Sequence, residues 1–385
     1  MARLKYWVWF SALDLSPLRK AKLLECMESP ETLFFMDPGG IESAFGKLSP
    51  TEKKQLGDKS LGGVNEILSR CDSEGYSVLT LQDADYPERL RSIPDAPAVL
   101  YIQGSLPELD ELVALGIVGT RQATPYGYRM AYRLGSETAE AGALVVSGLA
   151  KGADSAAMEG ALRAGGTVLG VLGTGIDRVY PAENRELFAQ TAAQGALLSE
   201  YPPGARVYPT NFLHRNRIIA ALSLGVIVTE APVRSGALST ARCALEYNRD
   251  VYAVPGNADA PACAGCLALL RDGAEPITEV GSVVERYSGV YGLLPKRSEP
   301  VFGENLAKKG IDKPKSVPYI DIMEKMEGLP PEQKAVAQAL TEPTMSVDEL
   351  VLKTGLSVGT VNAALTMLQM AGLVKQVAGR RYSLG

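Results

Sequence analysis

The feature that most constrains this chain is a regular alternation, from about Leu112 to Tyr287, of short apolar runs with helix-length amphipathic segments. The apolar runs have the length of strands and read ALGIVG, ALVVSG, TVLGVLG, GALLSE, GVIVTEA and DVYAVPG. Strands that are apolar on both faces and joined by helices predict a mainly parallel, doubly wound sheet. Ligands bind such sheets at the carboxyl ends of the strands, so the residues after each run are candidates for a site.

The segments that flank this region predict further domains. Residues 1–70 read as short helices that begin at Ser-Pro pairs, at Ser16, Ser29 and Ser49, because a capping residue followed by Pro is typical of a helix start. We therefore expect a small helical domain over residues 1–70 and an α/β domain over residues 71–288.

The last part of the chain predicts a linker and a third domain. Residues 289–330 contain PKRSEP and KKGIDKPKS without sustained periodicity, which is typical of a flexible linker. Residues 331–385 read as successive helices capped at Ser346 and Ser357, then a hairpin turning at Gly379, the order of a winged helix-turn-helix. The third helix carries Asn362, Thr366 and Gln369 but no Arg or Lys, so contact with DNA and contact with protein both stay open.

Composition limits the class of protein. A chain of 385 residues with 46% hydrophobic content is long enough for several folded domains. It contains no run of about 18 apolar residues, and its first residues lack a small-residue cleavage site, so we expect neither a membrane span nor secretion. The five cysteines are scattered, which favours free thiols in the cytoplasm over a disulfide framework.

The sequence gives little support for a metal site, a bound cofactor or a Ser/His/Asp catalytic triad. Cys263 and Cys266 have zinc-ligand spacing, but a second pair is needed. His214 is the only histidine, and it supports no Ser/His/Asp arrangement. We expect no metal, no cofactor and no catalytic residue.

The net charge of -5 argues mildly against a nucleic-acid partner. Arg and Lys nevertheless recur at the loops of the predicted α/β domain, so a local basic groove on an acidic body is compatible with the sequence.

Two glycine-rich loops predict an anion site. Gly119, Thr120 and Arg121 follow the first strand, and Gly148 and Lys151 follow the second. A glycine turn into a helix start offers free N–H groups and the positive end of the helix dipole, which suit a phosphate. Each loop alone could equally be a plain structural turn. We also expect Asp154 or Ser155 to cap the second helix.

A third cluster follows later in the chain. Phe212 precedes Arg215, Asn216 and Arg217, which we place at the start of a helix. Guanidinium groups suit phosphates, and an aromatic ring suits a stacked base. The alternative is that Phe212 lies in the core and the arginines pair with carboxylates.

Another loop follows GVIVTEA and contains Arg234 and Ser235. We expect Glu230, just before it, to orient an arginine rather than to perform catalysis.

A set of blocks in the same order resembles the DprA/Smf family. The blocks are GIVGTR, SGLAKGAD, VLGTGIDRVYPAEN, LLSEYPPG, RNRIIAALSLGVIVTEA, RSGALSTA and DVYAVPGN. Each is moderately specific, and their occurrence in order is highly specific. Residues 1–70, which resemble a SAM or helix-hairpin domain, and the winged-helix segment look like the family's flanking domains.

The resemblance implies an extended Rossmann-like domain that binds single-stranded DNA without regard to sequence, and a protein that is not an enzyme. It further implies a homodimer, with a surface around Val251 to Ala274, that protects incoming DNA and loads a RecA-type recombinase in natural transformation or recombination. Carried over residue by residue, DNA binding falls on Gly119, Thr120, Arg121, Gly148, Lys151, Phe212, Arg215, Asn216, Arg217, Arg234 and Ser235.

The chain departs from the family pattern at single positions. Leu213 stands where relatives commonly have Pro, Ala182 where some carry a cation, and Ser155 to Met158 where many have His. These departures put individual contacts in doubt and leave the fold unaffected.

The rival interpretation is a nucleotide phosphoribohydrolase resembling the lysine-decarboxylase-like family. Its catalytic turn would fall near Ser235 to Cys243, where Cys243 stands in place of the required carboxylate. A nicotinamide-dependent enzyme has weaker support, because no G-x-G-x-x-G follows the first strand.

Overall fold

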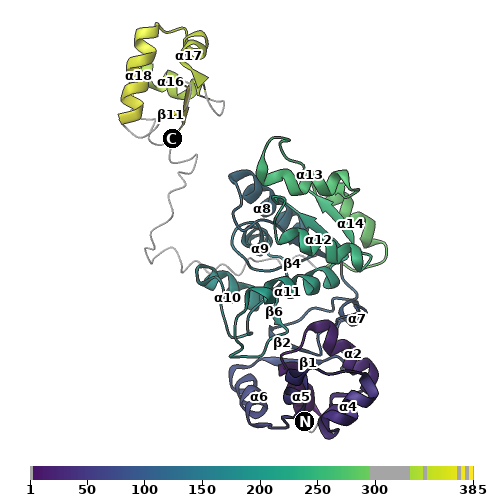
Figure 1. Ribbon diagram of the computed structural model, residues 1–385. Helices are drawn as coiled ribbons and strands as arrows, with labels where there is room; N and C mark the ends of the chain where they lie inside the picture. The colour runs from purple at the N-terminus through teal and green to yellow at the C-terminus, as the bar shows by residue number, and fades with distance from the viewer. Residues whose placement is uncertain (1–2, 295–329, 341–344, 371–373, 378–380, 385) are drawn as a thin grey trace. The chain divides into compact units, whose positions relative to one another are not determined.

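The computed structural model describes residues 3–294, 330–340, 345–370, 374–377 and 381–384 (Figure 1). The chain divides into two compact units, Met1–Phe302 and Gly303–Gly385. Most of the linker predicted over residues 289–330 lies outside the described residues. Within the described ranges, no helix has the length and apolar character needed to cross a membrane.

The first unit begins with a group of short helices, purple in Figure 1. Ser16, Ser29 and Ser49 cap three of them through side-chain oxygens, as predicted. Buried Trp7 and Phe10 belong to the same apolar core as Tyr101 of the sheet, so these helices and the sheet share one core. The helices are α1 (Leu4–Ala12), α2 (Pro17–Met27), α3 (Pro30–Phe35), α4 (Pro38–Phe45), α5 (Pro50–Gly57) and α6 (Gly62–Glu74), and α6 runs across the boundary expected at residue 70.

The sheet of the first unit is the predicted doubly wound, mainly parallel sheet. Its strand order is β1-β2-β6-β5-β4-β3-β7-β8-β9. Strand β2 runs antiparallel to its neighbours β1 and β6, and all other pairs are parallel. The strands are β1 (Ser77–Thr80), β2 (Val99–Gly104), β3 (Ala114–Val118), β4 (Leu144–Ser147), β5 (Val168–Leu172), β6 (Ala196–Ser199), β7 (Gly225–Val228), β8 (Asp250–Ala253) and β9 (Glu275–Pro276).

Helices cover both faces of this sheet. One core contains buried residues of α8, α9, α10 and α14, and the other contains those of α7, α11, α12 and α13. The strands are buried between the two layers, which explains their continuous apolar sequences. The helices are α7 (Glu88–Arg91), α8 (Pro125–Glu140), α9 (Ala153–Arg163), α10 (Arg185–Gln194), α11 (Pro209–Leu222), α12 (Ala237–Glu246), α13 (Ala264–Arg271) and α14 (Gly281–Ser288).

The strand order reverses between β3 and β7. From β3 the chain passes outward through β4, β5 and β6, and α11 then returns it to β7 on the other side of β3. The loops that follow β3 and β7 therefore diverge and leave a crevice at the carboxyl ends of these strands.

The second unit is a winged helix, as predicted. Ser346 forms a capping box with Glu349, and Ser357 accepts a hydrogen bond from the Thr360 amide at 3.2 Å. Gly379, the predicted hairpin turn, lies outside the described residues. The elements are α16 (Pro331–Ala339), α17 (Val347–Thr354), α18 (Val358–Met370) and an antiparallel sheet of β10 (Met345–Ser346), β12 (Arg381–Leu384) and β11 (Val374–Val377).

Candidate nucleic-acid interface

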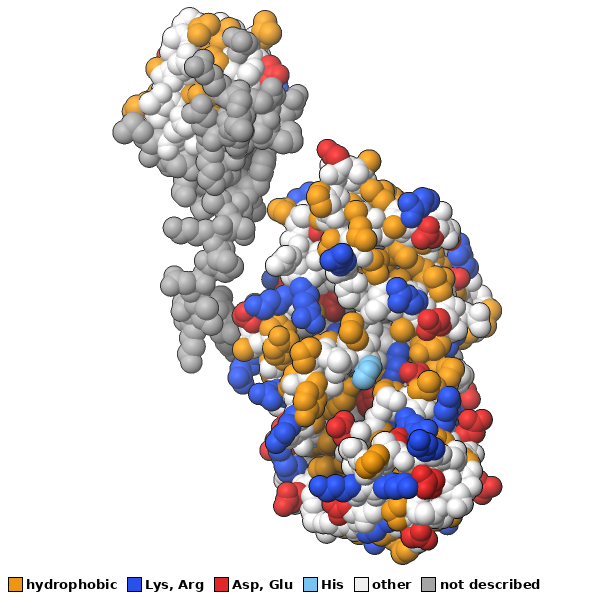
Figure 2. All heavy atoms as spheres, viewed as in Figure 1, with side chains coloured by type: hydrophobic (Ala, Val, Ile, Leu, Met, Phe, Trp, Pro, Cys, Tyr) orange, Lys and Arg blue, Asp and Glu red, His pale blue; other side chains and the backbone are white. Residues whose placement is uncertain are grey.

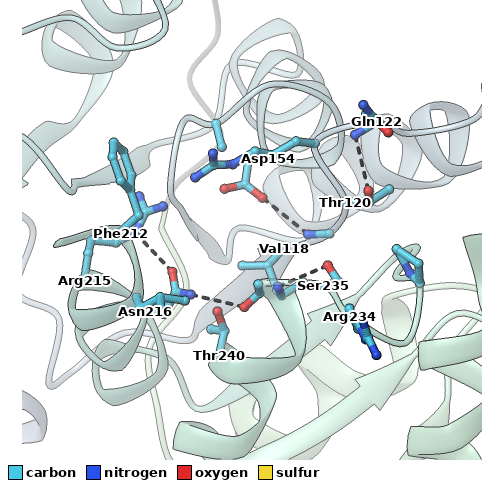
Figure 3. Close-up of a pocket in the computed structure, with 17 residues that line it drawn as sticks. Val118, Thr120, Gln122, Asp154, Phe212, Arg215, Asn216, Arg234, Ser235 and Thr240 are labelled. Carbon is cyan, nitrogen blue, oxygen red and sulfur yellow. Dashed lines mark hydrogen bonds between the residues drawn. The ribbon is translucent and has the colours of Figure 1, made fainter. Parts of the chain in front are cut away.

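A hollow of about 460 Å³ lies at the carboxyl ends of β3 and β7 (Figure 3). A slot of about 60 Å³ adjoins it and shares the side chains of Arg121 and Phe212. Gly148 and Lys151 line the slot, and Arg217 lines neither space. The structure thus brings most of the predicted site together. The predicted residues that line the hollow are Gly119, Thr120, Arg121, Phe212, Arg215, Asn216, Arg234 and Ser235.

The carboxylate of Asp154 occupies the position where we expected a phosphate. The Gly119 amide donates to Asp154 Oδ1 at 3.3 Å, and the amides of Gly148 and Ala150 also contact this carboxylate. Burial raises the pKa of Asp154, while nearby Arg215 and these amides oppose the shift. The prediction that Asp154 or Ser155 caps helix α9 is wrong, since no side chain caps it. These loop amides therefore already bind an anion supplied by the chain itself.

Arg215 lies beneath the two glycine-rich loops. Its side chain is only 4% exposed, and Nη1 donates to the carbonyls of Gly148, at 2.7 Å, and Val171. Nε donates to Asn216 Oδ1 at 3.3 Å. Burial lowers the pKa of Arg215 to about 10, and the charge of Asp154 limits that shift. Arg215 therefore holds the loops in place with donors that face inward.

Arg217 forms a buried ion-pair network, as the alternative interpretation proposed for the arginines. Its Nη2 donates to both carboxylate oxygens of Glu200 at 2.9 Å, and its Nε lies 3.1 Å from Asp95 Oδ2. Burial lowers the pKa of Arg217, but Glu200 and Asp95 outweigh it, so the pKa is raised.

Asn216 is also engaged inside the protein. Its Nδ2 donates to Ser239 Oγ at 2.8 Å and to the Gly236 carbonyl at 3.2 Å, on the neighbouring helix α12. The prediction that Arg215, Asn216 and Arg217 begin a helix is wrong, because α11 already begins at Pro209. The three side chains lie on the inner side of that helix.

Cations and aromatic rings line the hollow and the adjoining slot. The guanidinium of Arg121 lies 5.2 Å from the centre of the Phe212 ring, and the Tyr180 ring lies 5.2 Å from the same ring. Lys151 pairs with Glu183, and both side chains are more than half exposed. Arg234 is exposed, and neither it nor Arg121 forms an ion pair with any described residue. We call Arg121, Lys151, Tyr180, Phe212 and Arg234 the cationic rim.

Surface charge is otherwise mixed. On the face of the larger unit in Figure 2, Lys and Arg side chains lie among acidic and hydrophobic ones and form no continuous basic field. This agrees with the overall charge of -5.

Two residues of the recognised blocks have roles that the sequence did not reveal. The Glu230 carboxylate accepts from the Thr124 amide at 2.7 Å and its hydroxyl at 2.6 Å, so the expectation that it orients an arginine is wrong. Tyr180 stands in a recognised block, and its aromatic ring was the available signal.

The loops after β5 and β6 are tied together by Asp177. Its carboxylate accepts from the Gly204 amide at 3.1 Å and from Arg70 Nη2, on α6, at 2.8 Å. Arg70 and Asp177 are 107 positions apart in the sequence, so no local pattern marks the pair.

The thiols of the C-x-x-C segment are buried. Cys266 Sγ donates to the Val228 carbonyl at 3.6 Å, and burial raises the pKa of Cys266 to about 12. Cys263 is also buried, and both cysteines are free thiols.

Comparison with known proteins identifies the family. The family model of DNA recombination-mediator protein A matches residues 77–288, and the DprA winged helix domain matches residues 325–380. The chain belongs to the DprA/Smf family. Protein Smf of Synechocystis sp. is 34% identical over 98% of this chain and 98% of its own length. DNA processing protein DprA of Bacillus subtilis is 38% identical over 60% of this chain and 76% of its own length.

Solved DprA structures share the fold. DprA from Streptococcus pneumoniae matches with a TM-score of 0.63 and 31% identity, over 74% of this chain and 96% of that one. DNA processing protein A from Helicobacter pylori matches with a TM-score of 0.51 and 32% identity, over 56% of this chain and 97% of that one. The work on the Helicobacter protein describes its single-stranded DNA binding mode. The resemblance inferred from the ordered blocks is confirmed.

Proposed function

We propose that this chain binds single-stranded DNA along the cationic rim. The observation that carries the proposal is the exposed guanidinium of Arg121, which lies 5.2 Å from the Phe212 ring at the mouth of the hollow. A cation that no described residue neutralises suits a backbone phosphate, and a half-exposed ring suits an unstacked base. The Helicobacter DprA, described as binding single-stranded DNA, supports the same activity here.

The predicted contact residues divide into three groups in this proposal. Arg121, Lys151 and Arg234 meet phosphates, and Phe212 stacks a base, because these side chains reach solvent. Gly119, Thr120, Gly148 and Ser235 shape the loops that carry the rim, because the missing β carbon of Gly148 leaves room for the Arg215 guanidinium and the Gly119 amide binds Asp154. Arg215, Asn216 and Arg217 hold helix α11 and the loops in position. Contacts of this kind favour binding that depends on salt and hardly on base sequence.

The biological role follows from the family. We propose that the protein acts in the cytoplasm, where it protects incoming DNA and loads a RecA-type recombinase in natural transformation or recombination. The family description as a recombination mediator supports this role. A homodimer would align two rims and cover a longer strand than one chain could. We assign DNA binding to the domain over residues 71–288, flanked by the helical domain of residues 1–70, the linker of residues 289–330 and the winged helix of residues 331–385.

We propose no enzymatic activity. A phosphoribohydrolase would need a free carboxylate beside the hollow. Asp154 is the one carboxylate among the residues that line it, and its oxygens bind loop amides. Cys243 stands where the hydrolase pattern has a carboxylate, and it does not line the hollow.

The test is fluorescence-anisotropy binding of a labelled single-stranded oligonucleotide and its duplex at two salt concentrations. The parent chain should bind the single strand more tightly, and more weakly at high salt. Arg121→Glu combined with Lys151→Glu should abolish binding. Lys22→Glu combined with Lys54→Glu, two exposed cations on the N-terminal helices, is the matched control and should bind like the parent. If the parent does not bind, or both double variants behave alike, the proposal is wrong.

A further inference from the structure

One cation of the rim is already neutralised by the protein itself. Lys151 forms an ion pair with Glu183, in which both side chains are more than half exposed. Neither Arg121 nor Arg234 forms an ion pair within the described ranges of the chain. Lys151 thus differs from the other two cations of the rim, because a phosphate that reached it would find a carboxylate in place.

The turn that carries Glu183 is fastened to the loop that carries Lys151. Asn184, the residue after Glu183, donates from Nδ2 to the Leu149 carbonyl at 2.9 Å and to Ser155 Oγ at 2.8 Å. Leu149 stands two positions before Lys151 in the sequence. These bonds hold the two backbone segments together, so only the two side chains lose conformational freedom when the ion pair forms.

The two members of the pair line different spaces. Lys151 lines the slot of about 60 Å³, which has no carboxylate among its lining residues. Glu183 lines a separate groove of about 280 Å³, together with the carboxylates of Glu159 and Glu186 and the guanidinium of Arg163. Carboxylates outnumber cations in this groove, so it repels a phosphate. A DNA strand would therefore reach Lys151 from the slot and not from the groove.

The Glu183 carboxylate resembles a phosphate in its chemistry toward Lys151. The hydrogen bond from Lys151 lowers the pKa of Glu183 below its ordinary value, so the carboxylate is ionised at neutral pH. A carboxylate and a backbone phosphate both carry negative charge and both accept charge-assisted hydrogen bonds from an ammonium group. Glu183 and a DNA phosphate would therefore compete for the same Nζ atom.

We propose, on the basis of the DNA binding proposed for the rim, that Glu183 is an internal competitor that lowers the affinity of the rim for single-stranded DNA. In the free protein Glu183 holds Lys151, and a backbone phosphate displaces it to gain that contact. The displaced carboxylate takes up a counterion, so binding releases fewer ions in total than the cations of the rim would release without Glu183. Removal of the Glu183 charge makes binding both tighter and more dependent on salt.

The test is fluorescence-anisotropy binding of a labelled single-stranded oligonucleotide to the full chain over a series of salt concentrations. At low salt Glu183→Gln should bind roughly twofold to fivefold more tightly than the parent, the range that one exposed ion pair can supply. The decline of affinity with salt should become steeper, by up to about one phosphate contact. Glu186→Gln removes an equal charge from the same groove, is the matched control and should bind like the parent.

A double-mutant cycle with Lys151→Met shows whether Glu183 acts through Lys151. Glu183→Gln should gain no affinity in the Lys151→Met background, because the carboxylate then has no cation to occupy. An equal gain in both backgrounds, or in Glu186→Gln, would mean that Glu183 acts only as a distant negative charge, and the role as competitor would be wrong. Unchanged affinity in Glu183→Gln would overturn that role and leave DNA binding intact. A parent chain that binds no single strand would instead overturn the proposed function, and this role with it.

Discussion

The amide of Gly119 donates to the carboxylate of Asp154 at 3.3 Å, across the loops that follow β3 and β4. A glycine-rich turn at the start of a helix ordinarily suggests a phosphate cradle. Here a buried carboxylate from α9 fills that position, and the cations available to a ligand lie further out, on the cationic rim. The cations therefore divide into buried ones that hold the loops and exposed ones that can meet a ligand.

Gly148→Ala should destabilise the protein. A β carbon at Gly148 would lie 2.3 Å from Arg215 Nη1, and the buried guanidinium cannot move away without losing its carbonyl partners. Overpacking of this kind costs about 1–3 kcal/mol in the free energy of unfolding, measured by urea denaturation. Gly236→Ala is the control, because a β carbon there meets no atom within 4 Å. Equal stability of the two variants would contradict this view of Arg215.

Arg217→Ala should lower the stability of the protein, whereas Arg121→Ala should lower its affinity for DNA. Removal of Arg217 leaves Glu200 and Asp95 without their buried partner, so the free energy of unfolding should fall by about 3–5 kcal/mol. Arg121 is exposed, so its loss should leave stability unchanged but weaken DNA binding and reduce the salt dependence by about one phosphate contact. Urea denaturation and a salt titration of affinity separate the two. If Arg217→Ala weakened DNA binding but left the free energy of unfolding unchanged, the structural role assigned to Arg217 would be wrong.

Arg70→Ala should weaken DNA binding at a distance from the rim. Arg70 and Gly204 share the carboxylate of Asp177, which fixes the loops after β5 and β6 against α6. A half-exposed ion pair contributes little, so we expect roughly a twofold to fivefold loss of affinity by anisotropy. Lys53→Ala breaks a comparable pair with Glu42 on the N-terminal helices and should have no effect. A loss in both variants would point to a general change in the helical part.

Lys20 should make stability rise with pH. Burial lowers the pKa of Lys20 from 10.5 to about 8, although Glu200 opposes the shift. Between these two values the folded chain binds fewer protons than the unfolded chain, so the free energy of unfolding increases with pH across that window. The destabilising contribution is fully present below pH 8 and has disappeared above 10.5.

The measurement is urea denaturation at intervals between pH 7 and pH 11. Lys20→Met should flatten the rise by roughly 1–3 kcal/mol relative to the parent. Lys22→Met, an exposed lysine on the same helix, should keep the slope of the parent. Identical slopes in all three proteins would exclude Lys20 as the group responsible.

The sequence predicted the architecture better than the site. Continuous apolar runs specify buried parallel strands, and the loops at their carboxyl ends that contain Gly119 and Gly148 line the hollow and its adjoining slot. The orientation of the Arg215 to Arg217 segment could not be predicted, because it depends on which side of α11 faces β4 and β5. Charged residues in a basic block suggested exposure, whereas Arg215 and Arg217 are buried with partners from other segments.

Long-range partners explain the other differences. Asp154 reaches Gly119 across 35 positions, and Arg70 reaches Asp177 across 107, so no periodicity connects either pair. The prediction that Asp154 caps its own helix depends only on local spacing. In the structure, the Asp154 carboxylate instead accepts from the Gly119 amide, in the loop after a different strand. The glycine loops were placed correctly, but their ligand within the protein was not foreseen.

The charge network of Arg217 has a consequence for how the rim is assembled. Its carboxylate partners are Asp95, from the segment before β2, and Glu200, the residue after β6, so the network ties helix α11 to both segments. The pair between Arg217 and Asp95 closes a long loop of the chain, which costs conformational entropy. A chain in which these segments have not docked would present Arg121 and Arg234 of the cationic rim without the spacing that they have in the folded protein. Binding of a single strand along the rim would then depend on completed folding of this unit.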